Sequence, residues 1–459
     1  MLCCRISPVN ARATDPGSNA RILKIEEFIK EAVRNDGTFE EILLDGMSLK
    51  YVKALKIPAD DLLLSVKSQY ELNIEDNDGA PRLIIGLNRL FPYTGTDISA
   101  EYTTAPSISL DKNSSEITLL ISQPIAENAF GKATVLLDKI TGLETDITGH
   151  QVVEAYEDYL AAVITAYYNW FSAYENLKIG EISYKKNISL LDNIKKRREN
   201  NIALPIDVNK IEIQSLAKKE DLIRLQERYD NIHNFIRQAV RSGTDEVLQP
   251  SDPFMFENRE IAFEDDFSTF KHTSRTYRIL GILEEKSSLE VAKDANELLP
   301  SADLLFGYAV EGDDITLKDR QQTVYAGISM TWPLPGQKER AEYETSKIAH
   351  RKIKVSNDNK YLELETDLRN LFQQIEREKK LILIAEKKIR LAESILEDET
   401  VNYAYGKVSL NDFIDAANRV DENRFNKILH SVQLKILTTE WMRMTDRLIS
   451  EKDIKSISE

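Results

Sequence analysis

The chain has 459 residues, a formal net charge of −16, and charged side chains at 30% of its positions. This length suffices for a large core or for two to three ordinary domains. The acidic balance argues against a nucleic-acid partner, because no basic stripe is available to bind phosphate. The low content of glycine and proline, 17 and 13 residues, suits long solvated helices better than a loop-rich sandwich.

The N-terminus has an unusual composition. Both cysteines, Cys3 and Cys4, lie there, so the folded body is expected to hold no disulfide. Residues 1–20 are expected to be disordered or the remnant of a signal peptide, since Ala11-Arg12-Ala13 has the form of a cleavage site. Cys4 is also a candidate for lipidation, although Cys3 stands where a lipoprotein signal has a small residue. No stretch offers the roughly 20 apolar residues of a transmembrane helix.

Strands are expected over about residues 82–125. The apolar residues Ile117, Leu119 and Ile121 are spaced by two and are followed by Pro124. Such a period of two is typical of a strand with one apolar face. Residues 82–91 and 97–104 are the expected partners of this strand, and they are joined by a turn.

A helical hairpin is expected over about residues 131–241. Aromatic and aliphatic residues from Tyr156 to Leu177 follow the spacing of three and four residues that is typical of a packed helix face. Gly142 and Gly149 each cost about 1 kcal/mol relative to alanine, so a bend or break is expected near residues 141–150. Residues 200–207 form the turn, where Asn tolerates a left-handed conformation and Pro205 starts the return helix.

The second half repeats this plan. Alternating residues predict strands over about 302–334, and the segment 337–405 contains neither Gly nor Pro. Within it a heptad pattern predicts a helix of roughly 100 Å that packs against partner helices. In the turn at 405–412, Gly406 is expected to end this helix, and Ser409 or Asn411 to begin the return helix. The heptad positions are Leu368, Ile375, Ile382, Ile389 and Leu396.

The two halves therefore indicate an internal duplication. Pro124 matches Pro333 at an offset of 209, and Ile202 matches Val408 at an offset of 206. We expect a first repeat over residues 21–241, a linker or equatorial segment over 242–272, a second repeat over 273–450, and a tail over 451–459. Two strand pairs are too few to close a barrel, so several chains would have to share one.

These marks together resemble the TolC family of outer-membrane efflux and secretion channels, from about residue 21 to residue 452. The family has strand ends like Gln123-Pro124 and Trp332-Pro333, and a hairpin tip with a Tyr, a Gly three residues on, and Asp residues at nine and twelve. Tyr403, Gly406, Asp412 and Asp415 have this spacing.

The resemblance implies a mainly α fold with a small β part. Duplicated long helical hairpins would form a coiled-coil α-barrel, and four or so strands per chain would contribute to a trimeric, twelve-stranded outer-membrane β-barrel. The implied function is passive export across the periplasm and outer membrane of a Gram-negative bacterium, in a tripartite efflux or type I secretion system. The implied partners are two further copies of the chain, a periplasmic adaptor (membrane fusion) protein, an inner-membrane transporter of unknown class, and outer-membrane lipid.

The resemblance also assigns roles at the tips. Asp412 and Asp415 would line an iris-like periplasmic entrance as a ring of six carboxylates, which raise one another's pKa and attract cations. The alternative is that Asp412 is a helix-start residue favoured by the helix dipole and Asp415 a solvated neighbour. Tyr403 would hold the entrance closed by bonding Asp207. The family's latch arginine falls at Val408, so the adjacent Lys407 is its expected substitute.

The adaptor would contact both tips, although ordinary turn chemistry is an alternative explanation of these residues. The expected contacts are Asn201, Ile202, Ala203, Gly406, Lys407 and Val408.

Other classes of protein are less well supported. The five histidines are far apart without metal-ligand spacing, and no nucleotide-binding or hydrolase motif occurs, so neither an enzyme nor a metal or cofactor site is expected. A hydrolase with a coiled-coil stalk has no candidate catalytic residues. A soluble coiled-coil scaffold or tethering protein is the main alternative to a channel.

Overall fold

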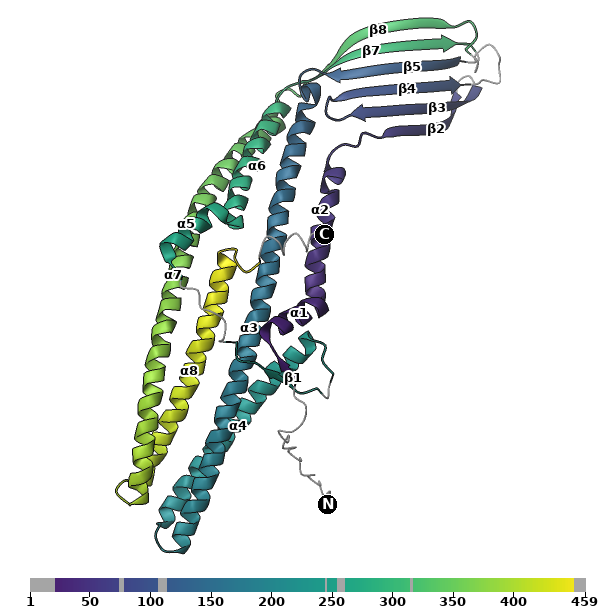
Figure 1. The fold of residues 1–459 in the computed structure, drawn as a ribbon. Coiled ribbons are helices and arrows are strands. Elements are labelled where there is room, and N and C mark those ends of the chain that lie inside the picture. The colour runs from purple at the N-terminus through teal and green to yellow at the C-terminus, as the bar shows by residue number, and fades with distance from the viewer. Residues whose placement is uncertain are drawn as a thin grey trace, which may run out of the picture.

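The computed structural model describes residues 21–73, 78–105, 114–243, 246–253, 261–313 and 317–449. The segments 1–20 and 451–459, for which a disordered or signal remnant and a tail were expected, lie outside these residues. The described chain is elongated, with a β-sheet at one end and two helical hairpin tips at the other (Figure 1). None of the described helices is long and apolar enough to span a bilayer.

Two helical hairpins of equal size form the long body. Helix α3 (Lys132–Glu199) is followed by α4 (Pro205–Ala239), and α7 (Gln337–Ala404) by α8 (Leu410–Met444). Helices α3 and α7 both have 68 residues, and α4 and α8 both have 35. Both helices of the second hairpin start 205 positions after their counterparts (337 − 132 and 410 − 205). The structure thus has the duplication, with an offset of 205 for the helices, while the ends of β5 (Pro124) and β8 (Thr331) are 207 positions apart.

Of the bend or break predicted near residues 141–150, the break is wrong, because α3 is helical from end to end. Helices α2 (Gly37–Lys56) and α6 (Arg275–Glu297) lie along this part of α3 (Figure 1). Lys53 pairs with Asp138 at 3.0 Å, and Lys286 pairs with Glu144 at 2.8 Å. Packing on two neighbours therefore outweighs the low helix propensity of the glycines.

A small equatorial layer surrounds the middle of α3. It consists of β1 (Arg21–Leu23), which pairs in parallel with β6 (Leu248–Pro250), and of helix α1 (Ile25–Asn35), while α5 (Phe263–Thr273) packs against α7 and α8. Tyr167 and Trp170 are fully buried there, 5.7 Å apart, and the Tyr167 hydroxyl donates to the Leu23 carbonyl at 2.7 Å. The aromatic face of α3 thus serves helix packing, and the expected linker 242–272 contributes β6 to this layer and most of α5 to the packing on α7 and α8.

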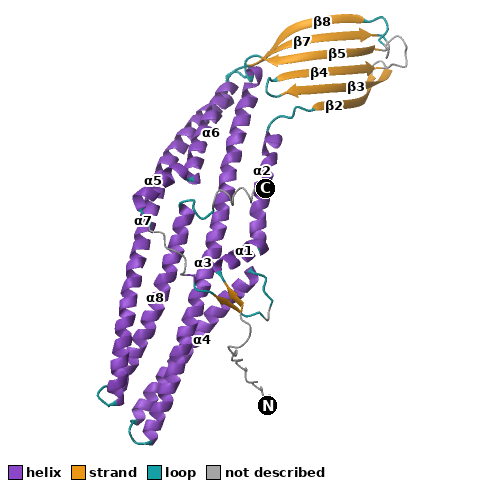
Figure 2. Cartoon of the chain, in the orientation of Figure 1, coloured by secondary structure: helices purple, strands orange, loops and turns teal. Residues whose placement is uncertain are grey.

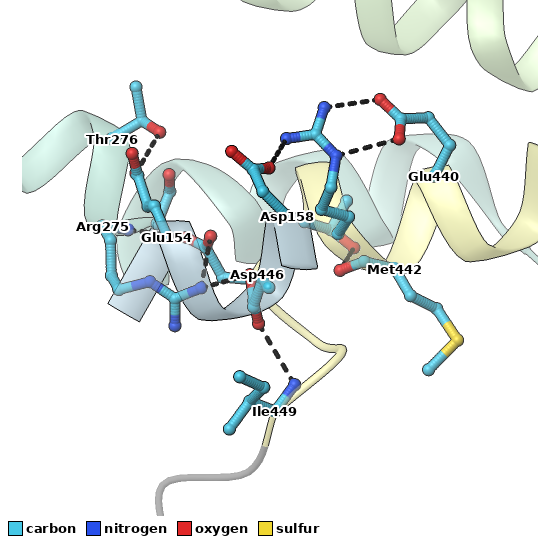
Figure 3. A network of polar contacts seen from close by, with 12 residues as sticks. Glu154, Asp158, Arg275, Thr276, Glu440, Met442, Asp446 and Ile449 are labelled. Atoms are coloured by element: carbon cyan, nitrogen blue, oxygen red, sulfur yellow. Dashed lines mark hydrogen bonds and ion pairs between the residues drawn. The ribbon is translucent and has the colours of Figure 1, made fainter. Parts of the chain in front are cut away.

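Buried ion pairs fix the end of α8 to α3 and α6 (Figure 3). The guanidinium of Arg275 pairs with Glu157 and, at 2.9 Å, with Asp446. Glu157 also accepts a hydrogen bond from the Ile449 backbone at 3.1 Å. Burial raises the pKa of Glu157 to about 7, although the Arg275 charge opposes this shift.

Six strands form one antiparallel sheet in the order β2-β3-β4-β5-β7-β8, and Figure 2 shows them together at one end of the molecule. The strands expected over 82–125 and 302–334 are present, but β2 was missed, so one chain contributes six strands and not four or so. Three leucines at the start of β2 hide its alternation. The strands are β2 (Leu62–Asn73), β3 (Asp78–Phe91), β4 (Thr96–Ala105), β5 (Ser114–Pro124), β7 (Ser301–Gly312) and β8 (Gln321–Thr331).

Candidate functional site

The sheet has one apolar face that crosses all six strands. Because neighbouring strands are in register, residues of one row share a face, and the next residue along each strand faces the opposite side. One apolar row consists of Leu64, Leu87, Ala100, Leu119, Tyr308 and Val324. The adjacent row on the other face consists of Ser65, Gly86, Glu101, Thr118, Ala309 and Thr323.

The apolar face is open to its surroundings. Leu64 is 66% exposed, Leu119 46% and Val324 81%. Monomeric soluble proteins rarely expose contiguous apolar patches of this kind. Strands of 10 to 14 residues match the roughly 9–11 residues that a tilted strand needs to cross a bilayer. Phe91 and Trp332 lie at the helical end of this face, where aromatic residues are enriched at a membrane interface.

Both edges of the sheet are unpaired within the part of the chain that the structure describes. Strand β2 pairs with β3 alone, and β8 with β7 alone. In lipid, unpaired backbone groups along an edge are expensive, because no water is present to satisfy them. A sheet of this form therefore requires further strands from other chains if it lies in a membrane.

The two hairpin tips at the opposite end have the same backbone design. Asn201 and Gly406 follow α3 and α7 with φ of +57° and +72°. The next residue in each tip returns a hydrogen bond to the helix, from Ile202 to Arg197 at 2.8 Å and from Lys407 to Asn402 at 2.9 Å. This is the Schellman geometry, so the expected left-handed Asn and the Gly406 cap are confirmed.

The return helices also start alike. Ser409 is the N-cap of α8, and its backbone donates to the Asp412 carboxylate at 3.0 Å. In the first tip the Leu204 backbone donates to Asp207 at 3.2 Å. Asp207 and Asp412 thus occupy equivalent positions, 205 residues apart. Asp412 and Asp415 are both exposed, and hydrogen bonds from Ser409 lower the pKa of Asp412. Within one chain Asp412 has the local helix-start role, while the carboxylate ring stays a prediction.

Tyr403 lies between the two tips. Its ring stacks on Phe413 at 5.6 Å, and the guanidinium of Arg197 lies 5.1 Å above it. Burial raises the pKa of Tyr403, Arg197 opposes this shift, and Asp207 adds to it. Asp207 is therefore near enough to act on Tyr403 electrostatically, whereas the hydrogen-bonded latch stays a prediction.

The cation beside Tyr403 is Arg197, which the sequence reasoning missed. Lys407, the expected substitute for the family arginine, lies instead 5.7 Å above the ring of Tyr405. The basic run Lys196-Arg197-Arg198 in the last turn of α3 was the available signal.

A cavity of about 470 Å³ opens between the hairpins just above the tips. Its walls come from α3 on one side, including Leu190 and Asn193, and from α7 and α8 on the other, including Leu396 and Phe413. At the tips, Ile202 is 66% exposed, and Asn201, Gly406 and Lys407 are exposed, while Ala203 and Val408 are half-buried. The expected adaptor contacts thus lie at one end of the molecule.

No family model and no curated protein matches this sequence, but solved structures match its fold. CusC, described as forming a transmembrane channel, is 11% identical with a TM-score of 0.71 over 95% of both chains. The outer membrane protein VceC from Vibrio cholerae is 13% identical with a TM-score of 0.70, over 92% of this chain and 95% of its own. The Campylobacter jejuni outer membrane channel CmeC is 13% identical with a TM-score of 0.70, over 95% and 89%.

The chain has the fold of the TolC-type outer-membrane channels. The TolC-type fold includes the duplicated helical hairpins and the small sheet that the sequence led us to expect. The chain departs from that expectation in its six strands per protomer.

Proposed function

We propose that this chain forms a homotrimeric outer-membrane channel, a passive export conduit that extends into the periplasm of a Gram-negative bacterium. The observation that carries the proposal is the sheet with one exposed apolar face and two unpaired edges, placed at the end of 68-residue helices. A soluble scaffold would leave this apolar face and these strand edges in water. In the proposed channel, lipid covers the apolar face, and strands of neighbouring copies pair with the two edge strands.

The helices also carry apolar stripes that no described element covers. On α4 large exposed apolar residues follow one another at intervals of three and seven, and on α7 at intervals of seven from Ile348 to Leu362 and of eight from Leu383 to Leu391. Such spacing is typical of helices that pack on partners. All of the following are more than half exposed: Ile206, Ile213, Leu216, Ile223, Ile348, Val355, Leu362, Leu383 and Leu391. Three copies would bury these stripes in a tube of twelve helices.

The gated entrance belongs to the same proposal. The tips would form an iris in which Asp412 and Asp415 of three copies make the carboxylate ring, and Tyr403 with Asp207 the latch. Arg197 and not Lys407 is the cation placed to support that latch.

Tyr403→Phe keeps the stacking on Phe413 but removes the hydroxyl, so we expect longer open times in single-channel records; unchanged gating would contradict the latch.

The proposed partners follow from the two ends of the molecule. A periplasmic adaptor protein would contact the tips beside the cavity between the hairpins, and through it an inner-membrane transporter would deliver cargo for efflux or type I secretion. No catalytic step is required of the channel, because transport down a continuous lumen needs no chemistry on the cargo.

Expression of the full chain with an export signal tests the proposal. We expect the protein in the outer-membrane fraction, as a heat-modifiable trimer that gives discrete conductance steps in planar bilayers. A variant with Val324→Asp and Ile328→Asp on the apolar face should lose membrane insertion, while Thr323→Asp and Ser329→Asp on the polar face should keep it. A monomer that ignores lipid and detergent would overturn the proposal.

A further inference from the structure

The hairpin β2–β3 continues the sheet without interruption. Strand β2 pairs with β3 along its whole length, from Leu62 with Arg89 to Asn73 with Asp78. Strand β3 pairs with β4 from Leu83 with Thr104 to Phe91 with Thr96. Its strands are as long as the other four, with 12 and 14 residues against 10 to 12. The hairpin is therefore part of the same wall and not a loop folded beside it.

The hairpin also obeys the division of faces. Val66 lies in the apolar row with Ile85 and Tyr102, and Lys67 lies on the opposite face in the row with Thr103. Val66 is 63% exposed, like the apolar residues of β8 at the far edge. A hairpin surrounded by water is expected to carry polar residues on both faces. The apolar face of β2–β3 continues that of the neighbouring strands, which indicates the same environment for all six.

The direction of the edge strands permits closure. Neighbouring strands are antiparallel throughout, so the first and last of six strands run in opposite directions. When copies stand side by side, β8 of one copy meets β2 of the next in antiparallel orientation, as a barrel requires. We infer that three copies close a barrel of eighteen strands through a β8–β2 seam, and this inference rests on the trimeric channel proposed above.

The girth of the two parts of the tube is compatible with this count. Strands spaced by about 4.8 Å and tilted by about 40° give eighteen strands a circumference of roughly 113 Å, and twelve strands roughly 75 Å. Twelve helices with interaxial distances of 8–10 Å give roughly 96–120 Å. At this tilt a barrel of eighteen strands therefore fits the width of the helical tube. A barrel that used β4 as its closing edge would have to break the β3–β4 ladder.

Cysteine pairs on the polar face test the seam. Ser65→Cys on β2 with Ser329→Cys on β8 places thiols at the two edges. Within one chain they are five strand spacings apart across the sheet and six residues apart along it, or roughly 31 Å. Ser99→Cys on β4 with Ser329→Cys is the corresponding pair for the twelve-stranded alternative, three strand spacings apart across the sheet and four residues apart along it, or roughly 20 Å within one chain. Each variant is treated in membranes with a bismaleimide that spans only adjacent strands. The parent chain and the three single variants give the background from Cys3 and Cys4.

We expect the Ser65→Cys/Ser329→Cys variant to give covalent dimers and trimers on denaturing gels, at least tenfold above the single variants, and the Ser99→Cys/Ser329→Cys variant to give none. Products from the second pair without the first would overturn the eighteen-stranded barrel. Native mass measurement of the same samples distinguishes the failure of the seam from the failure of the channel. A trimer without the Ser65–Ser329 product would contradict the β8–β2 seam but not the trimeric channel. A monomer would contradict the channel itself.

Discussion

Single carboxylates at the tips combine a local role with a proposed collective one. Asp412 caps α8 through Ser409, and this cap lowers its pKa in the isolated chain. If three copies bring Asp412 and Asp415 around one axis, their mutual repulsion acts in the opposite direction. The two roles can be separated by changing the cap and the charge independently.

The double variant Asp412→Asn/Asp415→Asn should reduce the preference for cations over anions several-fold, because it removes all six carboxylates of the ring. Ser409→Ala is the matched control, since it weakens the same cap but keeps both charges. Reversal potentials in a salt gradient measure the selectivity. An equal change in both variants would attribute the effect to the cap, and no change in either would contradict the ring.

Glu157 predicts a pH dependence of stability. Its pKa of about 7 lies above the ordinary value of 4.5, so the folded chain holds this proton more tightly than the unfolded chain. The resulting stabilisation is present below about pH 4.5 and is lost as the pH rises through 7. Between pH 5 and 8 the free energy of unfolding should fall by up to about 2.5 kcal/mol more in the parent chain than in Glu157→Gln. Urea unfolding followed by helicity at several pH values checks this, and parallel curves for the two chains would contradict it.

At the scale of elements, the glycines of the long helices have opposite uses. Gly406 ends α7 with φ of +72°, a conformation that L side chains rarely adopt. Gly149 lies inside α3, and a Cβ added there would meet nothing within 4 Å. One glycine is required by its backbone conformation, and the other is tolerated by the packing around it.

Gly406→Ala should therefore destabilise the helical hairpins by about 1 kcal/mol, while Gly149→Ala should stabilise them by up to about 1 kcal/mol. Denaturation midpoints of the two variants and the parent chain provide the comparison. If both substitutions changed the stability in the same direction, the left-handed conformation at the tip would not be the reason for a glycine at position 406.

The sequence reveals local patterns better than it reveals neighbours. The heptads of α7, the cap at Ser409 and the left-handed Asn201 follow from short-range chemistry, and the structure has all three. The continuity of α3 depends on α2 and α6, which lie far away in sequence, so the predicted break was wrong. Arg197 was missed for the same reason, because its contact with Tyr403 crosses between two hairpins.

At the scale of the whole molecule, the exposed stripe on α4 should decide assembly. Ile213→Glu/Ile223→Glu places charges where a neighbouring copy would pack, and both residues are more than 60% exposed in the single chain. We expect this variant to fold but to remain monomeric, because buried unpaired charges are costly. Ile213→Leu/Ile223→Leu, which keeps the same stripe apolar, is the control and should still assemble. Light scattering in detergent gives the mass, and a trimeric double variant would contradict the proposed interface.

The β2–β3 hairpin enters and leaves the sheet at one rim, since its first residue, Leu62, is paired with Arg89 near the end of β3. A two-stranded unit of this kind is grafted or excised without rerouting the polypeptide that follows. In the proposed channel, each added hairpin would therefore widen the barrel by two strands per copy and leave the helices unchanged. A further hairpin could be inserted at the same rim to change the diameter of the proposed barrel.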